Sequence, residues 1–202
     1  IKSDNALLAN IFIGEEPLTK YARSFDSDKS FSSEEFIYNI VFPYGTEQLP
    51  EITWEGQVAD YASIVMVGDS VRGKTIITVT SANEYNVSDY ELYFDVRKSD
   101  NAYLKSLAIK DKPVAIDFDS IEFEYVVTFP IGTDTASLPT KDDILFERVL
   151  ATQSVEILQE SPTSIAVLVT AEDGVAMKAY SIKFEILLSN NTLLKDLKVM
   201  VG

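Results

Sequence analysis

The sequence predicts an all-β protein with two tandem β-sandwich domains, because the same pattern of strands occurs twice along the chain. The opening Ser3-Asp4-Asn5-Ala6 returns as Ser99-Asp100-Asn101-Ala102, and in a weaker form as Ser189-Asn190-Asn191-Thr192. An apolar template of constant spacing follows each opening: Leu8-x-x-Ile11-x-Ile13, Leu104-x-x-Leu107-x-Ile109 and Leu194-x-x-Leu197-x-Val199. We therefore expect a first repeat over residues 1–98 and a second over residues 99–188. Residues 189–202 would be the first strand of a third repeat or a C-terminal extension.

The next strand of each repeat alternates apolar side chains with a period of two. Such alternation places the matching positions on one face of a strand, toward a core. Proline ends each run, because it has no N–H for the strand ladder, and Gly-Thr follows as a turn. The aligned pairs are Phe36 with Phe123, Tyr38 with Tyr125, Ile40 with Val127, and Phe42 with Phe129.

The last hairpin repeats at a constant offset of 90 residues (170 − 80 and 180 − 90). Residues 171–174, Ala-Glu-Asp-Gly, predict a tight turn with Gly174 at positive φ. The first repeat has Asn-Glu-Tyr-Asn at 83–86 and no glycine there. The openings lie 96 residues apart and then 90 (99 − 3 and 189 − 99), so we expect an acidic, Ser-rich insertion at about 21–33.

Each repeat thus offers six or seven short strands and no segment of helical period. This pattern is typical of an immunoglobulin-like β-sandwich, and it predicts two such domains in tandem. Because the chain has no cysteine, the Cys-Trp-Cys hallmark of antibody domains is missing. The prediction therefore concerns the architecture alone.

The repeated motifs also carry a resemblance to a known family. Phe-x-Tyr-x-Val-x-Phe-Pro-x-Gly-Thr, Val-Thr-Ala-Glu-Asp-Gly and Tyr-Ser-Ile-x-Phe resemble an Ig-like repeat of Bacteroidetes surface and secreted proteins, which is grouped with bacterial cadherin-like β-sandwich domains. The likeness covers most of residues 101–186 and is weaker in the first repeat, which departs at 83–88. It implies an extracellular, cell-surface location, tethering through a lipid-modified N-terminus, and a role as a spacer or accessory module.

Composition excludes several classes of function. With 17 basic and 32 acidic residues the net charge is −15, which repels phosphate backbones and disfavours nucleic acid. The absence of Cys and His excludes disulfides, thiolate or imidazole metal sites and Ser-His-Asp triads. No apolar run approaches the roughly 20 residues of a membrane span, so no direct membrane insertion is expected.

Paired carboxylates do not by themselves predict an enzyme. Glu15-Glu16, Glu34-Glu35, Asp142-Asp143 and Glu172-Asp173 are adjacent in sequence, whereas a glycosidase needs two carboxylates across a cleft. We expect no catalytic residues and no organic cofactor.

Residues 68–75 match the phosphate-loop expression G-x-x-x-x-G-K-[ST] letter for letter. That chemistry needs a helix directly after the loop. Here a β-branched run begins at Thr75 and favours a strand. We interpret the match as a hairpin loop.

Calcium has two candidate sites. Asp26-x-Asp28-x-Ser30 spaces oxygen ligands as calcium loops do, but Phe31 and Ile37 replace the Gly and Glu of an EF-hand. A looser calcium loop and a solvated acidic loop both stay open. Asp100 and Asn101, like Asp4 and Asn5, lie where cadherins bind calcium between domains; the alternative is a turn in which these side chains bond local amides.

Exposed aromatic rings bind sugars by stacking, and Trp54, Tyr61, Tyr44 and Tyr85 are the candidates. An ungapped alignment places Trp54 opposite Asp142 or Asp143 and suggests exposure. A shifted alignment places it opposite Phe146 and suggests partial burial. Both alignments remain open.

These observations lead to two hypotheses of function. We expect a non-catalytic extracellular module of a bacterial cell-surface protein, a spacer or adhesion scaffold whose partners are neighbouring domains of the same polypeptide. The alternative is a glycan-binding accessory module that captures cell-surface, dietary or host polysaccharide.

Overall fold

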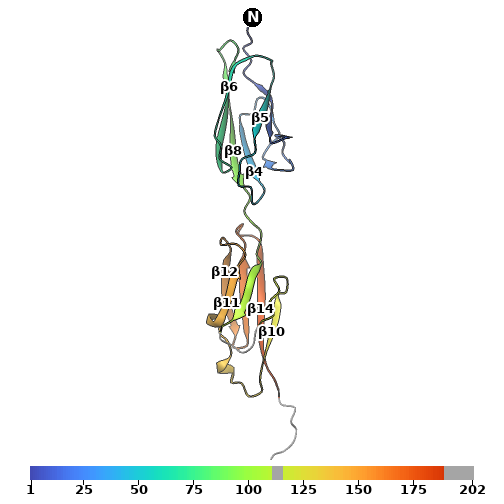
Figure 1. Cartoon of the computed structure of the whole chain (residues 1–202), viewed down its shortest axis with the longest axis vertical. Coiled ribbons are helices and arrows are strands. Elements are labelled where there is room, and N and C mark those ends of the chain that lie inside the picture. Colours follow the sequence, from blue (N-terminus) through green and yellow to red (C-terminus); the bar gives the residue numbers. More distant parts are fainter. Residues whose placement is uncertain (111–115, 189–202) are drawn as a thin grey trace, which may run out of the picture. The chain divides into compact units, whose positions relative to one another are not determined.

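The computed structural model of the protein describes residues 1–110 and 116–188 (Figure 1). The chain divides into two compact units, with the boundary between Lys98 and Ser99. Almost all regular structure in the described residues is β-strand, and the exceptions are two 3-10 turns, η1 and η2. The all-β prediction is confirmed. The expected strand of a third repeat, at 194–199, lies outside the described residues.

Unit 1 contains two sheets. The larger has the order β3-β4-β8-β7-β6 and the smaller the order β2-β1-β5. The strands are β1 (Leu8–Ile13), β2 (Glu16–Pro17), β3 (Asp26–Ser27), β4 (Ile37–Phe42), β5 (Ile52–Gly56), β6 (Tyr61–Val67), β7 (Gly73–Ser81) and β8 (Val87–Val96).

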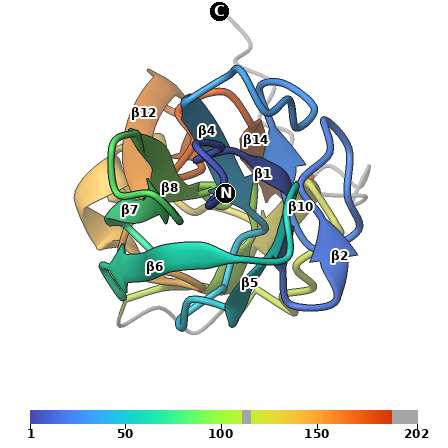
Figure 2. The ribbon, with the colours of Figure 1, turned by 90° about the horizontal axis from the view of Figure 1, so that it is seen from above.

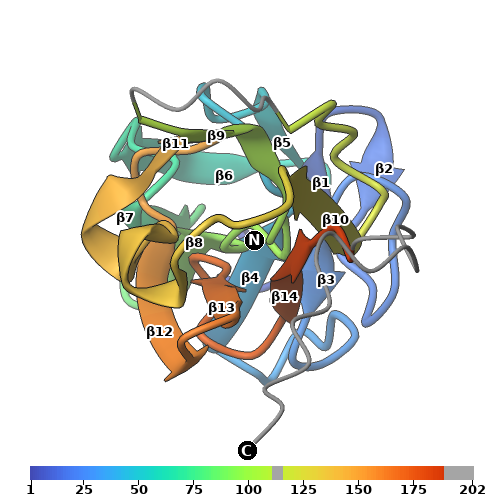
Figure 3. The same cartoon turned by 90° about the horizontal axis from the view of Figure 1, so that it is seen from below.

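Unit 2 repeats this plan with a four-stranded sheet, β10-β14-β13-β12, and a two-stranded sheet, β11-β9. Figure 3 shows β9 and β11 together on one side of the unit and β12, β13 and β14 on the other. The elements are β9 (Leu104–Ile109), β10 (Glu124–Phe129), η1 (Thr135–Ser137), η2 (Lys141–Asp143), β11 (Ile144–Arg148), β12 (Ser154–Ser161), β13 (Ser164–Thr170) and β14 (Met177–Ile186).

Each unit encloses its own apolar core between its two sheets. In unit 1, Leu8 and Ile11 of the small sheet and Tyr38 and Leu92 of the large sheet belong to one buried cluster. The predicted alternation is confirmed at Tyr38, Ile40 and Phe42, which are all buried. The first position of the run lies at the rim instead, because Phe36 is 38% exposed. Both units are therefore sandwich-like.

The sheets are antiparallel except for one parallel pair in each large sheet. β4 pairs with β8 and β10 pairs with β14 in the same register, so that Ile40 lies beside Phe94 and Val127 beside Phe184. This pairing was not predicted from the sequence, because a period of two shows which face a residue takes but not which strand lies beside it.

A pair of buried tyrosines anchors each core. In unit 1 the Tyr90 hydroxyl accepts a hydrogen bond from the Leu8 amide (3.0 Å) and donates one to the Ser33 carbonyl (2.9 Å). In unit 2 the Tyr180 hydroxyl bonds the Leu104 amide (3.1 Å) and the Ser120 carbonyl (2.9 Å). The strand that ends each unit is thereby joined to the strand that begins it.

The second tyrosine of each pair closes the loop before its own strand. The Tyr38 hydroxyl bonds the amide and the carbonyl of Ser32, and Tyr125 does the same at Asp119. A phenylalanine packs between the two tyrosine rings of each unit, Phe31 in unit 1 and Phe118 in unit 2.

These ring contacts locate the extra residues of unit 1. Phe31 corresponds to Phe118, an offset of 87 residues, whereas the openings differ by 96. The additional residues therefore lie between the end of β1 and Phe31, a range that overlaps the expected 21–33. This range includes β3, which pairs with β4 and covers that edge of the large sheet.

Candidate functional site

The extra residues of unit 1 build a surface pocket that serves as the candidate site. β1 turns at Gly14, where φ is +63°, and β2 then pairs back on it, with Glu16 beside Ile13. The buried side chains of Leu18 and Phe25 fix the segment to the core. The pocket has a volume of about 630 Å³, and its lining includes Glu15, Glu16, Tyr21, Arg23 and Pro50.

Glu16 holds the loop on the far side of this pocket. Its carboxylate accepts hydrogen bonds from the Arg23 amide (2.7 Å) and from the Ser24 amide (3.4 Å) and hydroxyl (3.2 Å). A carboxylate that receives several local amides closes a loop without a metal ion. Glu16 is therefore a structural anchor of the pocket.

Tyr21 supplies an aromatic face at the same pocket. Its side chain is 78% exposed, and the Lys20 ammonium lies 5.5 Å from its ring centroid. Aromatic, carboxylate and guanidinium groups together suit a ligand rich in hydroxyl groups, since the ring stacks on apolar faces and the charges bond hydroxyls. Tyr21 was not among the predicted aromatic candidates, although it lies in the longer segment of unit 1.

Trp54 is partly buried. In β5 it pairs with Ile11 of β1, as Phe146 of β11 pairs with Leu107 of β9. The alignment of Trp54 with Phe146 is therefore the right one. The Trp54 side chain packs against the core of unit 1.

Tyr61 is also partly buried, and its hydroxyl has protein partners. It donates to the Leu7 carbonyl (2.6 Å) and accepts from the Val58 amide (3.3 Å). Its ring lies over Gly56, where an added Cβ would be 2.4 Å from the ring. Tyr61 closes the edge of the sandwich.

Tyr44 and Tyr85 are exposed but far from each other. Tyr44 follows the end of β4, where Phe42 lies beside Val96, the last residue of β8. Tyr85, 87% exposed, lies just before β8 begins at Val87. At about 3.3 Å per residue the length of β8 separates them by roughly 30 Å. The four predicted aromatic residues do not form one stacking surface.

In the predicted calcium loop, the Asp26 and Asp28 carboxylates bond other residues of unit 1. Asp26 forms an ion pair with Arg97. Asp28 accepts hydrogen bonds on both oxygens from Asn39, at 3.1 Å from the backbone amide and 2.9 Å from the side chain. Ser30 is exposed. Within residues 1–110 and 116–188 no group of three or more acidic side chains is arranged to hold a metal ion.

The opening of unit 2 is a local turn. The Asn101 amide donates to the Ser99 hydroxyl (3.1 Å), and the Asn101 side chain accepts from the Tyr103 amide (2.9 Å). Unit 1 makes the same bonds with Ser3, Asn5 and Leu7. Asp100 is exposed beside this turn. The turn interpretation accounts for the recurrence of these residues.

The phosphate-loop match is a hairpin loop, as predicted. β6 ends at Val67 and β7 begins at Gly73, and the two strands are antiparallel. Gly68 has φ +123°, and a Cβ there would lie 2.5 Å from the Lys74 carbonyl oxygen. The Lys74 ammonium forms an ion pair with Glu91 (2.7 Å). Strand β7 follows the loop, so the loop lacks the helix N-terminus at which a nucleotide phosphate would bind.

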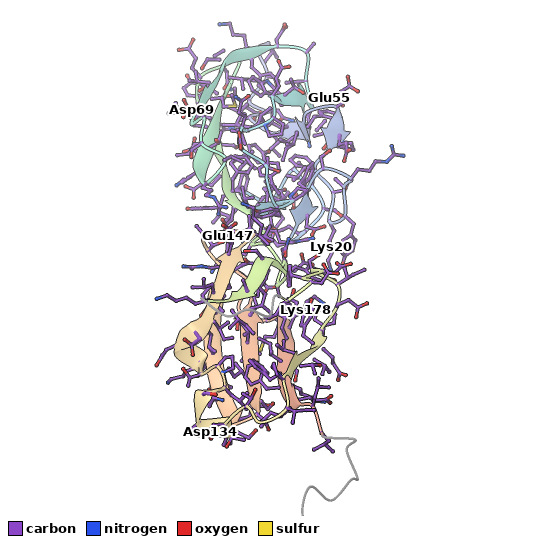
Figure 4. The ribbon with its side chains drawn as sticks, turned by 60° about the horizontal axis from the view of Figure 1, so that its bottom comes forward. Lys20, Glu55, Asp69, Asp134, Glu147 and Lys178 are labelled. Carbon is purple, nitrogen blue, oxygen red and sulfur yellow. The ribbon has the colours of Figure 1, made fainter. Side chains whose placement is uncertain are left out.

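Paired carboxylates have structural partners or lie on the surface. Asp143 caps η2 through the Thr140 amide (2.8 Å), and Asp173 accepts the Val175 and Ala176 amides (2.8 and 2.9 Å). These two amides lower the pKa of the Asp173 carboxyl. Figure 4 shows other acidic side chains, such as Glu55 and Asp134, on the surface.

Comparisons with protein-family models, with curated proteins and with solved structures find no match to this chain. In the part of the chain that the structure describes, no helix is long and apolar enough to cross a membrane.

Proposed function

We propose that the chain consists of two tandem immunoglobulin-like domains that serve as a non-catalytic, extracellular module of a bacterial cell-surface protein, as a spacer or adhesion scaffold. The observation that carries the proposal is the repeated core. Each unit has its own buried cluster and its own tyrosine link between first and last strands. The two units therefore share the buried core and the tyrosine hydrogen bonds that stabilise each sandwich.

The immunoglobulin-like assignment rests on size and layering. The units comprise residues 1–98 and 99–202, and each has two sheets around one core and mostly antiparallel strands, as small sandwich domains do. The location at the cell surface rests on the family resemblance of the repeated motifs. The charge of −15 favours solubility and disfavours nonspecific association with other acidic surfaces.

Protease treatment of intact cells that express the full-length protein tests this proposal. Antibodies against both units should lose their signal after protease is added outside the cell, while an internal marker keeps its signal. A protected signal would contradict the surface location. Hydrolysis of polysaccharide or peptide substrates by the purified chain would contradict the non-catalytic role.

A second candidate function is capture of glycans, and the pocket at Tyr21 favours it. The pocket lies in the longer segment of unit 1, and its exposed ring, Glu15 and Arg23 are suited to sugar hydroxyls and faces. The partners in this case would be cell-surface, dietary or host polysaccharides.

A glycan array probed with and without calcium separates the two functions. Specific binding that Tyr21→Ala abolishes would support capture at the pocket, with Tyr85→Ala as a matched control on another exposed tyrosine. Binding that requires calcium would instead revive a calcium-dependent site. An array without signal in either condition favours the spacer.

A further inference from the structure

Strand β6 forms one edge of the large sheet in unit 1. Among the described residues β6 has β7 as its single sheet neighbour, and the opposite edge is covered by β3. An edge strand presents unpaired N–H and C=O groups that can pair with another strand. Figure 2 shows β6 at the margin of the unit. Its free edge is therefore open to a partner strand.

The side chains of β6 are apolar on both faces of the sheet. Val65 pairs with Thr78 and Val67 with Ile76, on the outer face, whereas Met66 pairs with the buried Ile77. Yet Val65, Met66 and Val67 are 51%, 38% and 67% exposed. A strand added beside β6 would cover apolar groups on both sides at once.

The corresponding edge of unit 2 carries charges that prevent such pairing. β12 pairs with β13 as β6 pairs with β7, and Glu156 lies opposite Leu168 where Val65 lies opposite Thr78. Glu160 adds a second carboxylate to β12, whereas β6 has no charged residue from Tyr61 to Val67. Charged residues on an edge are the usual protection against strand pairing. Unit 1 lacks that protection.

We infer that β6 is a dimerisation edge, at which two copies of this chain pair their β6 strands antiparallel. A bulge between Tyr61 and Ser63 leaves a regular stretch of five residues, Ser63 to Val67. A two-fold axis at Val65 places Val65 opposite its copy, Ile64 opposite Met66, and Ser63 opposite Val67. The two copies of this five-residue stretch therefore meet each other without any charged side chain between them.

The second copy is the occupant that these residues favour. A two-fold contact brings the same uncharged stretch from both sides, so the charge of −15 on each copy meets no like charge within the paired stretch. The charges elsewhere still repel, and screening by salt should therefore strengthen the dimer. A basic peptide at the same edge would show the opposite salt dependence.

Sedimentation equilibrium of the full chain tests this inference. The short contact predicts a weak dimer that forms between about 10 μM and about 1 mM and tightens from about 50 to about 500 mM salt. Val65→Glu, which copies the residue of unit 2, places two like charges opposite each other and should weaken the dimer by about fivefold. The matched control Leu158→Glu changes the edge of unit 2 and should leave the dimer unchanged.

Crosslinking gives a second readout that does not depend on the Glu variant. The chain has no cysteine, and directly opposed residues of an antiparallel pair are close enough for a disulfide, at about 4.5–5.5 Å between Cα atoms. Val65→Cys should therefore form a crosslinked dimer on mild oxidation, faster than Leu158→Cys. A wild-type chain that stays monomeric to about 1 mM, a dimer that survives Val65→Glu, or equal crosslinking of the two Cys variants would overturn the inference.

Discussion

The Tyr90 hydroxyl accepts a hydrogen bond from the Leu8 amide, 82 residues earlier in the chain, at 3.0 Å. The ring that carries this hydroxyl is fully buried, and the same oxygen donates to the Ser33 carbonyl. Unit 2 repeats the relationship between Tyr180 and Leu104. One phenol thus satisfies two backbone groups at the point where the first strand begins.

Removing that hydroxyl should destabilise the unit that contains it. Tyr90→Phe leaves the Leu8 N–H and the Ser33 carbonyl without their partner, which costs about 1–3 kcal/mol in the free energy of unfolding. Tyr180→Phe should cost unit 2 a similar amount. Urea unfolding followed by fluorescence and circular dichroism measures both.

The control for this pair is Tyr93→Phe, because the Tyr93 hydroxyl bonds Glu91 on the surface. It should change stability by less than about 0.5 kcal/mol. An equal loss in Tyr93→Phe and Tyr90→Phe would show that the buried bonds have no special weight.

Stability should decline in alkali for the same reason. Burial is the main cause that raises the pKa of Tyr38, Tyr90, Tyr125 and Tyr180. A raised pKa means that the fold favours the neutral phenol, so the stabilisation is complete below the unfolded value of about 10 and is lost as pH rises through the folded value. Thermal midpoints measured from pH about 8 to about 11 should fall above pH about 10. Midpoints that stay level, with tyrosinate absorbance rising at the ordinary pKa, would contradict this.

The turn before the last strand differs between the units at one corresponding position. Glu84 has φ +65° and Gly174 has φ +72°. A non-glycine residue in the left-handed region costs about 1 kcal/mol in the folded state. Glycine avoids this cost, but its larger conformational entropy in the unfolded chain offsets part of the gain. Glu84→Gly should therefore stabilise unit 1 by about 0.5 kcal/mol, and Gly174→Glu should destabilise unit 2 by about 1 kcal/mol. Melting of the two variants checks both signs, and shifts of equal sign would refute the turn argument.

Gly68 should be required for the β6–β7 hairpin and not for nucleotide binding. Its φ of +123° and the 2.5 Å approach to the Lys74 carbonyl leave no room for a Cβ. Gly68→Ala should cost about 1–3 kcal/mol in stability. Equilibrium dialysis with ATP should show no binding to the wild-type chain; saturable ATP binding that Gly68→Ala and Lys74→Ala remove would restore the phosphate-loop interpretation.

Local pattern predicted the faces of the strands but not their neighbours. The alternation at Tyr38, Ile40 and Phe42 indicated the core face, and the β-branched run after Lys74 indicated a hairpin in place of a helix. The parallel pairing of β4 with β8 and the hydrogen bonds of Tyr90 and Tyr180 join residues 50 or more apart. The period of a sequence pattern does not indicate such distant partners.

The candidate site was predictable only in part. The comparison of the two repeats pointed to the extra segment of unit 1, and that segment does build the pocket with Tyr21. Trp54 and Tyr61 were chosen for their residue type, but Trp54 packs against the core of unit 1 and the Tyr61 ring lies over Gly56, and residue type does not indicate these contacts. Gln153, which is buried and donates to the carbonyls of Asn101 and Tyr103, had no motif to mark it.

Single-molecule stretching of the full chain tests most directly the claim that two self-contained sandwiches lie in series along the chain. The strands span 89 residues in unit 1 (96 − 8 + 1) and 83 in unit 2 (186 − 104 + 1). At roughly 3.4 Å per residue the chain should show two separate unfolding events, each releasing roughly 300 Å. Tyr90→Phe should lower the force of one event only. A single event that releases the whole length, or extension without a force peak, would contradict the account.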